Sequence, residues 1–169
     1  MKTSILSFIL SLSMFIGFAQ EKTKQQLKEE QKLEKQKEIA ALVDSKEFKF
    51  VGRTAYPQGG RSIDLTTNSN FLKFEKDSVD SEMPYFGRAY GGVAYGGGNG
   101  GMHFKGKIEN YSLTKDKKKY TIKAKITDKT DSYELQLTVF FEGNASLAIN
   151  TFNRSQISYS GRIEKLKEK

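Results

Sequence analysis

The chain has 169 residues, of which 37% are hydrophobic and 12% aromatic, and this is enough apolar material for one domain with a sizeable core. It contains no cysteine, which excludes disulfides, thiol nucleophiles, cysteine-ligated metals and a lipid-bearing cysteine. The single histidine, His103, excludes multi-histidine metal sites and is the only base available to a Ser-His-Asp mechanism. The formal net charge is +8, but the lysines alternate with glutamates or fall on the solvent side of predicted strands, which favours a solvated surface over nucleic-acid binding.

Residues 1–19 have the pattern of a secretory signal peptide, in which Lys2 precedes an apolar, serine-containing stretch that ends near the small residues Gly17 and Ala19. The apolar stretch is shorter than the roughly 20 residues that span a bilayer, so a retained membrane anchor is the weaker alternative. We therefore expect an exported protein with no integral membrane segment after the signal is removed. The absence of cysteine favours a bacterial periplasm or outer envelope and excludes a lipoprotein.

Residues 20–43 are predicted to form a charged helical arm. Residues 21–38 contain six lysines, five glutamates and four glutamines, with opposite charges recurring three positions apart, as on one side of a helix. Ile39, Leu42 and Val43 project to one side, so the last two turns can dock on a core while the front of the arm stays in water.

The chain after residue 44 alternates apolar and polar residues with a period of two. This pattern is clearest over residues 119–126 and 132–141, which are separated by a short polar connection and are predicted to pair as a hairpin. Further strands are predicted at residues 47–56, 61–65, 71–76, 102–107, 108–113, 145–151 and 156–163. Residues 44–164 are therefore expected to form a mainly β domain, either a single antiparallel β-sandwich or a small β-barrel of about eight strands, followed by a charged tail at 165–169.

Residues 83–101 are the most biased part of the chain, because eight of the 15 glycines lie between Gly87 and Gly101. Residues 96–101 match G-x-G-x-x-G, but no strand precedes them and no helix follows, so dinucleotide binding is rejected. Either the aromatic residues plug the end of the β core, or they contact a sugar face or an extended peptide, or the segment is disordered. The candidate ligand-binding residues are Tyr85, Phe86, Arg88, Tyr90, Tyr95 and Arg154. Arg154 is expected either to hydrogen-bond the segment or to flank a ligand.

Acidic residues offer a second hypothesis. Asp77, Asp80 and Glu82 form one group and Asp128 and Asp131 another, and a glycosidase needs two carboxyl groups placed across a sugar. Turn-forming roles are the simpler interpretation of these residues.

A calcium site formed by Asp77, Ser78, Asp80 and Glu82 would lack a full ligand loop, and we expect no metal and no cofactor. Asp77-Ser78-Val79 is similar to a bacterial O-glycosylation acceptor, with Ser78 as the attachment point. His103 is expected to be an ordinary strand residue.

Two separated motifs resemble the domain of unknown function 4251 family, whose members are exported proteins of Bacteroidetes-type bacteria. They are Pro84-Tyr85-Phe86-Gly87-Arg88-Ala89-Tyr90 and Asn153-Arg154-Ser155-Gln156-Ile157-Ser158-Tyr159-Ser160-Gly161. The resemblance covers about residues 43–163. Tyr159 stands where the family pattern suggests Phe, and the charged arm is unusually rich in Lys and Glu. The resemblance implies a small, mostly β, envelope-located domain, and it implies neither an activity nor catalytic residues.

The leading functional hypothesis is a noncatalytic exported protein that binds an envelope polysaccharide or protein through the Gly/Tyr-rich segment. The first alternative is a carboxylate-dependent hydrolase acting on envelope glycans. The second is a structural or inhibitor-like module that acts through the helical arm. The oligomeric state is left open.

Overall fold

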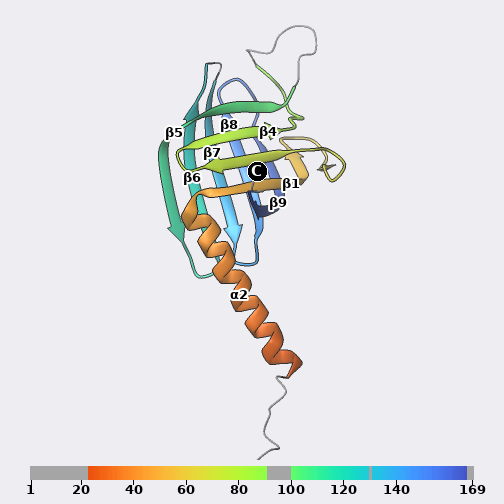
Figure 1. Ribbon diagram of the computed structural model, residues 1–169. Coiled ribbons are helices and arrows are strands. Elements are labelled where there is room, and N and C mark those ends of the chain that lie inside the picture. Colours follow the sequence, from red (N-terminus) through yellow and green to blue (C-terminus); the bar gives the residue numbers. More distant parts are fainter. Residues whose placement is uncertain (1–22, 91–99, 130, 167–169) are drawn as a thin grey trace, which may run out of the picture. The chain divides into compact units, whose positions relative to one another are not determined.

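The computed structural model describes residues 23–90, 100–129 and 131–166. The signal peptide predicted for residues 1–19 lies outside the described residues, as does the end of the tail. The elements (Figure 1) are the helix α2 Lys24–Ser45 and the strands β1 Glu47–Pro57, β2 Ile63–Asp64, β3 Phe71–Glu75, β4 Ser78–Met83, β5 Met102–Lys115, β6 Lys119–Thr127, β7 Ser132–Phe140, β8 Asn144–Thr151 and β9 Ile157–Lys165. None of the described helices is both long and apolar enough to cross a membrane.

The strands form a closed antiparallel β-barrel. Eight of them, β1 and β3 to β9, pair in sequence order around the barrel, and β9 pairs with β1 to close it, while the two-residue β2 attaches to the second half of β1. The barrel was one of the two architectures that the alternating pattern predicted. The predicted hairpin is confirmed, because β6 and β7 pair along their whole lengths.

Two glycines permit the barrel to close. Gly52 of β1 lies opposite Gly161 of β9, and the register shifts there, between Gly52 and Thr54. A Cβ atom at Gly161 would overlap the carbonyl oxygen of Val51 and approach the Phe50 ring to 2.9 Å. A side chain at this position would therefore force the first and last strands apart.

The alternation places one face of each strand in a continuous apolar core. The rings of Phe48 and Phe74 stack with centroids 4.9 Å apart, and those of Phe104 and Tyr133 stack at 3.9 Å. Because every strand contributes side chains at every second position, the barrel interior is filled rather than hollow.

Local hydrogen bonds cap both ends of the helix α2. The Thr23 hydroxyl accepts from the Gln26 amide and the Gln26 side chain accepts from the Thr23 amide, which is a capping box. The helix ends two residues later than predicted, where the Ser45 hydroxyl donates to the Leu42 carbonyl and Lys46 adopts a left-handed conformation with φ of 56°.

The docking residues of the helix are the predicted ones. Ile39, Leu42 and Val43 are buried in the core, while Leu27 and Leu33 are exposed. The last turns of α2 therefore belong to the β domain.

The predicted strands differ from the structure at two places. Residues 102–107 and 108–113 form the single strand β5, because a bulge between Ile108 and Asn110 lets one strand turn from β4 to β6 without a loop. Strand β4 was missed because its inward positions include a serine. Ser81 is buried and its hydroxyl donates to the Met102 carbonyl at 2.8 Å.

Asn70, which directly precedes β3, hydrogen-bonds to the backbone of β1 at Gly52. Its side chain is buried, with Oδ1 accepting from the Gly52 amide at 2.7 Å and Nδ2 donating to the Gly52 and Asn68 carbonyls at 3.1 and 3.0 Å. The amide thus replaces a missing strand partner at the bulge of β1.

Replacing this amide tests its role. Asn70→Ala leaves the Gly52 amide and carbonyl without their partner, so we expect the free energy of unfolding to fall by about 2 kcal/mol. Urea denaturation followed by circular dichroism measures the change. Asn144→Ala, at an exposed position of β8, is the matched control and should leave the midpoint unchanged.

Candidate functional site

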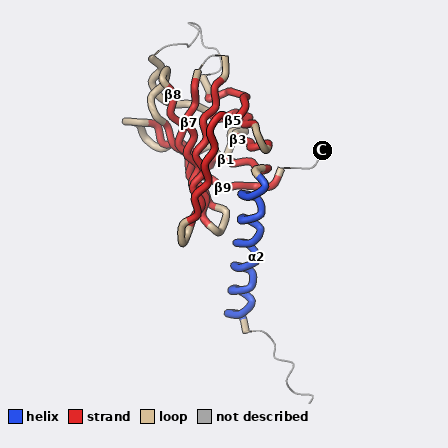
Figure 2. Tube along the Cα trace, turned by 90° about the vertical axis from the view of Figure 1, so that its left-hand side faces the viewer, coloured by secondary structure: helices blue, strands red, loops and turns tan. Residues whose placement is uncertain are grey.

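The candidate site lies at the end of the barrel away from the junction of α2 and β1. Because β1 starts at that junction and its neighbours run antiparallel, the connections that follow β1, β4, β6 and β8 gather at the other end. Figure 2 shows these loops in tan, opposite the helix junction. We call this region the rim and define it by residues 57–60, 68–69, 84–90, 100–103 and 153–155.

The two motifs behind the family resemblance meet at the rim. Ala89 forms an antiparallel bridge with Arg154, the Tyr90 amide donates to the Asn153 carbonyl at 2.7 Å, and the Ser155 amide donates to the Arg88 carbonyl at 2.8 Å. Segments about 65 residues apart in the chain are thus joined by backbone hydrogen bonds.

The Tyr85 hydroxyl lies at the centre of this junction. It is 2.7 Å from the Arg88 carbonyl oxygen, 3.0 Å from the Ser155 carbonyl oxygen and 2.8 Å from Ser155 Oγ, which in turn accepts from the Arg88 amide at 3.0 Å. A Cβ atom at Gly87 would overlap both the Tyr85 hydroxyl and Ser155 Oγ. Glycine is therefore required at position 87 by close approach rather than by backbone conformation.

Tyr159 supports the same segment from the core. Its ring is fully buried and its hydroxyl donates to the Pro84 carbonyl at 2.7 Å. Burial, reinforced by the neighbouring Tyr85, raises the pKa of Tyr159 above the usual tyrosine value, so the phenol stays protonated and can donate. This hydrogen bond gives a physical role to the tyrosine that stands where the family pattern suggests Phe.

Arg154 links the rim to the start of β5. Its guanidinium donates to the Gly101 carbonyl at 2.6 Å and lies over the Tyr85 ring, 5.2 Å from the centroid. A hydrogen bond to the glycine-rich segment was one of the two roles expected for Arg154; the role beside a ligand stays a prediction.

Cleft A lies on one side of the rim. It has a volume of about 520 Å³ and is lined by Pro57, Gln58, Gly59, Gly60, Phe86, Gly87, Arg88, Tyr90 and Ser155. Phe86 and Tyr90 are 39% and 69% exposed, and the exposed Arg88 makes no ion pair with another described residue. An aromatic surface with an available guanidinium therefore faces this cleft. Tyr95 lies outside the described residues.

Cleft B is a second hollow at the rim, and Tyr85 is among its lining residues. It also measures about 520 Å³ and is lined by Asn68, Ser69, Glu82, Pro84, Tyr85, Gly100, Gly101 and His103. His103 is exposed and faces Glu82 across the β4–β5 pair, as an ordinary strand residue does.

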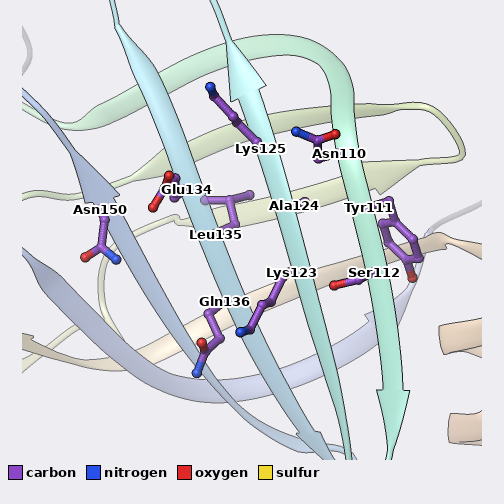
Figure 3. A pocket seen from close by; sticks show the side chains of 10 residues that line it. All are labelled: Asn110, Tyr111, Ser112, Lys123, Ala124, Lys125, Glu134, Leu135, Gln136 and Asn150. Atoms are coloured by element: carbon purple, nitrogen blue, oxygen red, sulfur yellow. The ribbon is translucent and has the colours of Figure 1, made fainter.

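A third hollow, the sheet groove, crosses the outer face of β5 to β8 (Figure 3). It measures about 460 Å³, and its side chains are mainly polar ones from alternate strand positions, among them Asn110, Lys125, Glu134 and Gln136. Sequence reasoning missed this groove because polar residues at every second position also describe an ordinary wet strand face.

The acidic residues have structural contacts. Asp80 points out of β4 to Lys105 at 3.3 Å, and Asp128 accepts from the Asp131 amide at 2.9 Å within the β6–β7 turn. Each of the three hollows has at most one carboxylate among its described lining residues. The part of the chain that the structure describes contains no group of three His, Cys, Asp or Glu side chains that could hold a metal ion.

Ser78 begins β4. Its side chain is half-buried and its hydroxyl donates to the Glu75 carbonyl at 3.4 Å. Its assignment as a glycosylation acceptor stays a prediction.

The fold and the rim define a class, an antiparallel β-barrel domain whose rim is fastened by two distant sequence motifs. Residues 30–163 match the family model described as a domain of unknown function, DUF4251, and the chain belongs to this family. It is similar to the crystal structure of a DUF4251 family protein from Bacteroides eggerthii, with 20% identity, a TM-score of 0.58, and coverage of 78% of this chain and 87% of that chain. The search of curated proteins found no match.

The role of the Ser155 hydroxyl at the junction with Tyr85 can be tested by substitution. Ser155→Ala removes the acceptor of the Arg88 amide and one partner of the Tyr85 hydroxyl, which should cost about 1–3 kcal/mol of unfolding free energy. Hydrogen exchange should also speed up at the Arg88 amide. Ser146→Ala, at an exposed site of β8, is the control and should alter neither measurement. Unchanged exchange at Arg88 in the Ser155 variant would contradict the assigned role.

Proposed function

We propose that this protein is an exported, noncatalytic binding module of the bacterial envelope, and that its contact surface is cleft A. The observation that carries the proposal is the placement of Phe86, Arg88 and Tyr90. All three are exposed and line or adjoin one cleft, while the residues between them are fixed to β9 through Tyr85 and Ser155. A surface that is already ordered loses little conformational entropy on binding.

The chemistry of cleft A favours a glycan with acidic groups. Aromatic rings offer stacking area to sugar faces, and a guanidinium binds carboxylate or phosphate groups through two parallel hydrogen bonds. No carboxylate lines the cleft among its described residues, so an anionic polymer meets no local repulsion there. An envelope polysaccharide is therefore the proposed partner.

The described lining residues of clefts A and B include no pair of carboxylates, which argues against the glycan hydrolase alternative. Glycoside hydrolysis needs two carboxyl groups about 5 to 9.5 Å apart across the bond that breaks. Clefts A and B together present only Glu82 among their described lining residues. Contact without catalysis fits this lining better.

Export is part of the proposal and rests on residues 1–19. Expression of the full chain in its own host, followed by fractionation and N-terminal mass spectrometry, tests it. A mature N-terminus near residue 20 in the envelope fraction supports export, and an intact chain in the cytoplasm would refute it.

Retention on envelope polysaccharide tests the contact surface. The triple variant Phe86→Ala, Arg88→Ala, Tyr90→Ala should lose at least about tenfold in retention of the mature protein on its host's polysaccharide fraction, because it removes both stacking and the cation. Phe140→Ala, an exposed aromatic at the opposite end of the barrel, is the matched control and should bind normally.

Two outcomes would count against this assignment. Unchanged retention by the triple variant, with its unfolding midpoint intact, would exclude cleft A as the contact surface. Loss of retention on deleting residues 21–38, with the triple variant unaffected, would favour the module that acts through its helical arm.

A further inference from the structure

Strand β5 changes neighbours along its length and leaves one edge open. Residues 102–107 pair with β4, whereas β6 pairs with residues 108–115 on the opposite edge. On the β4 side the last backbone hydrogen bond comes from the Ile108 amide to the Asp77 carbonyl at 2.8 Å. Beyond it, no described strand pairs with residues 109–115 on this edge. We call residues 109–115 on this side the open edge.

The centre of the open edge carries neither charge nor proline, and its protective features, a bulge and the charged Glu109 and Lys115, lie at its two ends. Exposed strand edges normally carry inward charges, prolines or short lengths that prevent contact with another strand. Here the five central residues, Asn110, Tyr111, Ser112, Leu113 and Thr114, are uncharged, although 28% of the chain is charged. Leu113 is 37% exposed. The composition of this edge therefore favours strand addition.

The open edge is also held in an extended conformation. Its other side is paired with β6 from Ile108 to Lys115, and the Lys46 ammonium lies over the Tyr111 ring at 4.2 Å from the centroid. Tyr111 is half-buried and packs against the core, and this burial, together with the nearby Asp44 carboxylate, raises the pKa of its hydroxyl. A partner strand would thus meet a preformed template.

We propose that the open edge pairs antiparallel with the open edge of a second copy of this chain, with the two-fold axis at Ser112. An axis at this residue pairs all seven open residues. Ser112 then faces Ser112, Tyr111 faces Leu113, and Asn110 faces Thr114. At each end the bulged residue Glu109 of one copy lies beside Lys115 of the other, so opposite charges meet twice.

Other registers pair fewer residues of the open edge or bring like charges together. Moving the axis by one residue in either direction leaves part of the open edge unpaired. An axis at Lys115 would place two ammonium groups opposite each other, which is destabilising. Both length and charge therefore select Ser112.

The dimer would join the sheet grooves of the two copies. Asn110 and Ser112 line the sheet groove (Figure 3), so the two grooves would adjoin across the axis and form one polar surface over two sheets. Pairing seven residues per copy buries less than the standard interface of about 1,600 Å², so self-association should be weak and best measured by cross-linking.

A single engineered cysteine tests the register, because the chain has no native thiol. In the proposed dimer the two Cα atoms at position 112 fall within disulfide range, while two residues at position 114 are separated by four steps of strand. Mild oxidation should therefore link Ser112→Cys into a dimer at least about tenfold faster than Thr114→Cys. Equal rates for the two variants, or no dimer from Ser112→Cys, would overturn the proposal.

Charge exchange gives a second, independent test. Glu109→Lys alone brings like charges together at both ends of the paired segment and should weaken self-association about fivefold in sedimentation experiments. Adding Lys115→Glu should restore it. Failure of the double variant to recover, with both variants folded, would refute this pairing. Neither test involves cleft A, so its outcome is separate from that of polysaccharide retention.

Discussion

Closure of the sheet by β1 and β9 is the constraint on which the rest of the structure depends. The two strands pair along nearly their full lengths, and they can do so because Gly52 and Gly161 face each other where the register shifts. No room exists there for a side chain, since the Val51 carbonyl occupies the space. Once the barrel closes, the start of β9 lies beside the segment that follows β4, and the rim is formed.

Neighbouring residues of one motif serve opposite purposes at that rim. Tyr85 and Gly87 face the Ser155 hydroxyl, and their geometry holds the backbone against β9. Phe86, Arg88 and Tyr90 alternate with them and face solvent. The same two-residue periodicity that builds the barrel thus separates the residues that hold the backbone from those that we propose as contact residues at the rim. Substitutions at Tyr85 or Gly87 would also displace the exposed residues. Only substitutions at Phe86, Arg88 and Tyr90 therefore test the proposed contact without disturbing the backbone.

Strand β5 pairs with β4 along its first part and with β6 along its second part. By turning from β4 to β6 at the bulge, it lets the sheet close without a loop, but the turn leaves backbone groups of residues 109–115 unpaired on one side. An edge of this kind, at the border of the sheet groove and without charged residues at its centre, is suited to a symmetric partner. The open edge, and with it the proposed self-association, is therefore a consequence of this bend.

Local periodicity was enough to predict the strands around Tyr120 and Leu137, the antiparallel hairpin they form, and the helix face of Ile39, because each depends on residues a few positions apart. Periodicity did not predict β4 or the buried Asn70, since Ser81 and Asn70 are polar and are satisfied by Met102 and Gly52, which lie far along the chain. Periodicity also did not distinguish a β-sandwich from a β-barrel. That choice, the junction of Tyr85 with Ser155 and the open edge of β5 were decided only by tertiary structure, because they depend on which distant backbone groups meet.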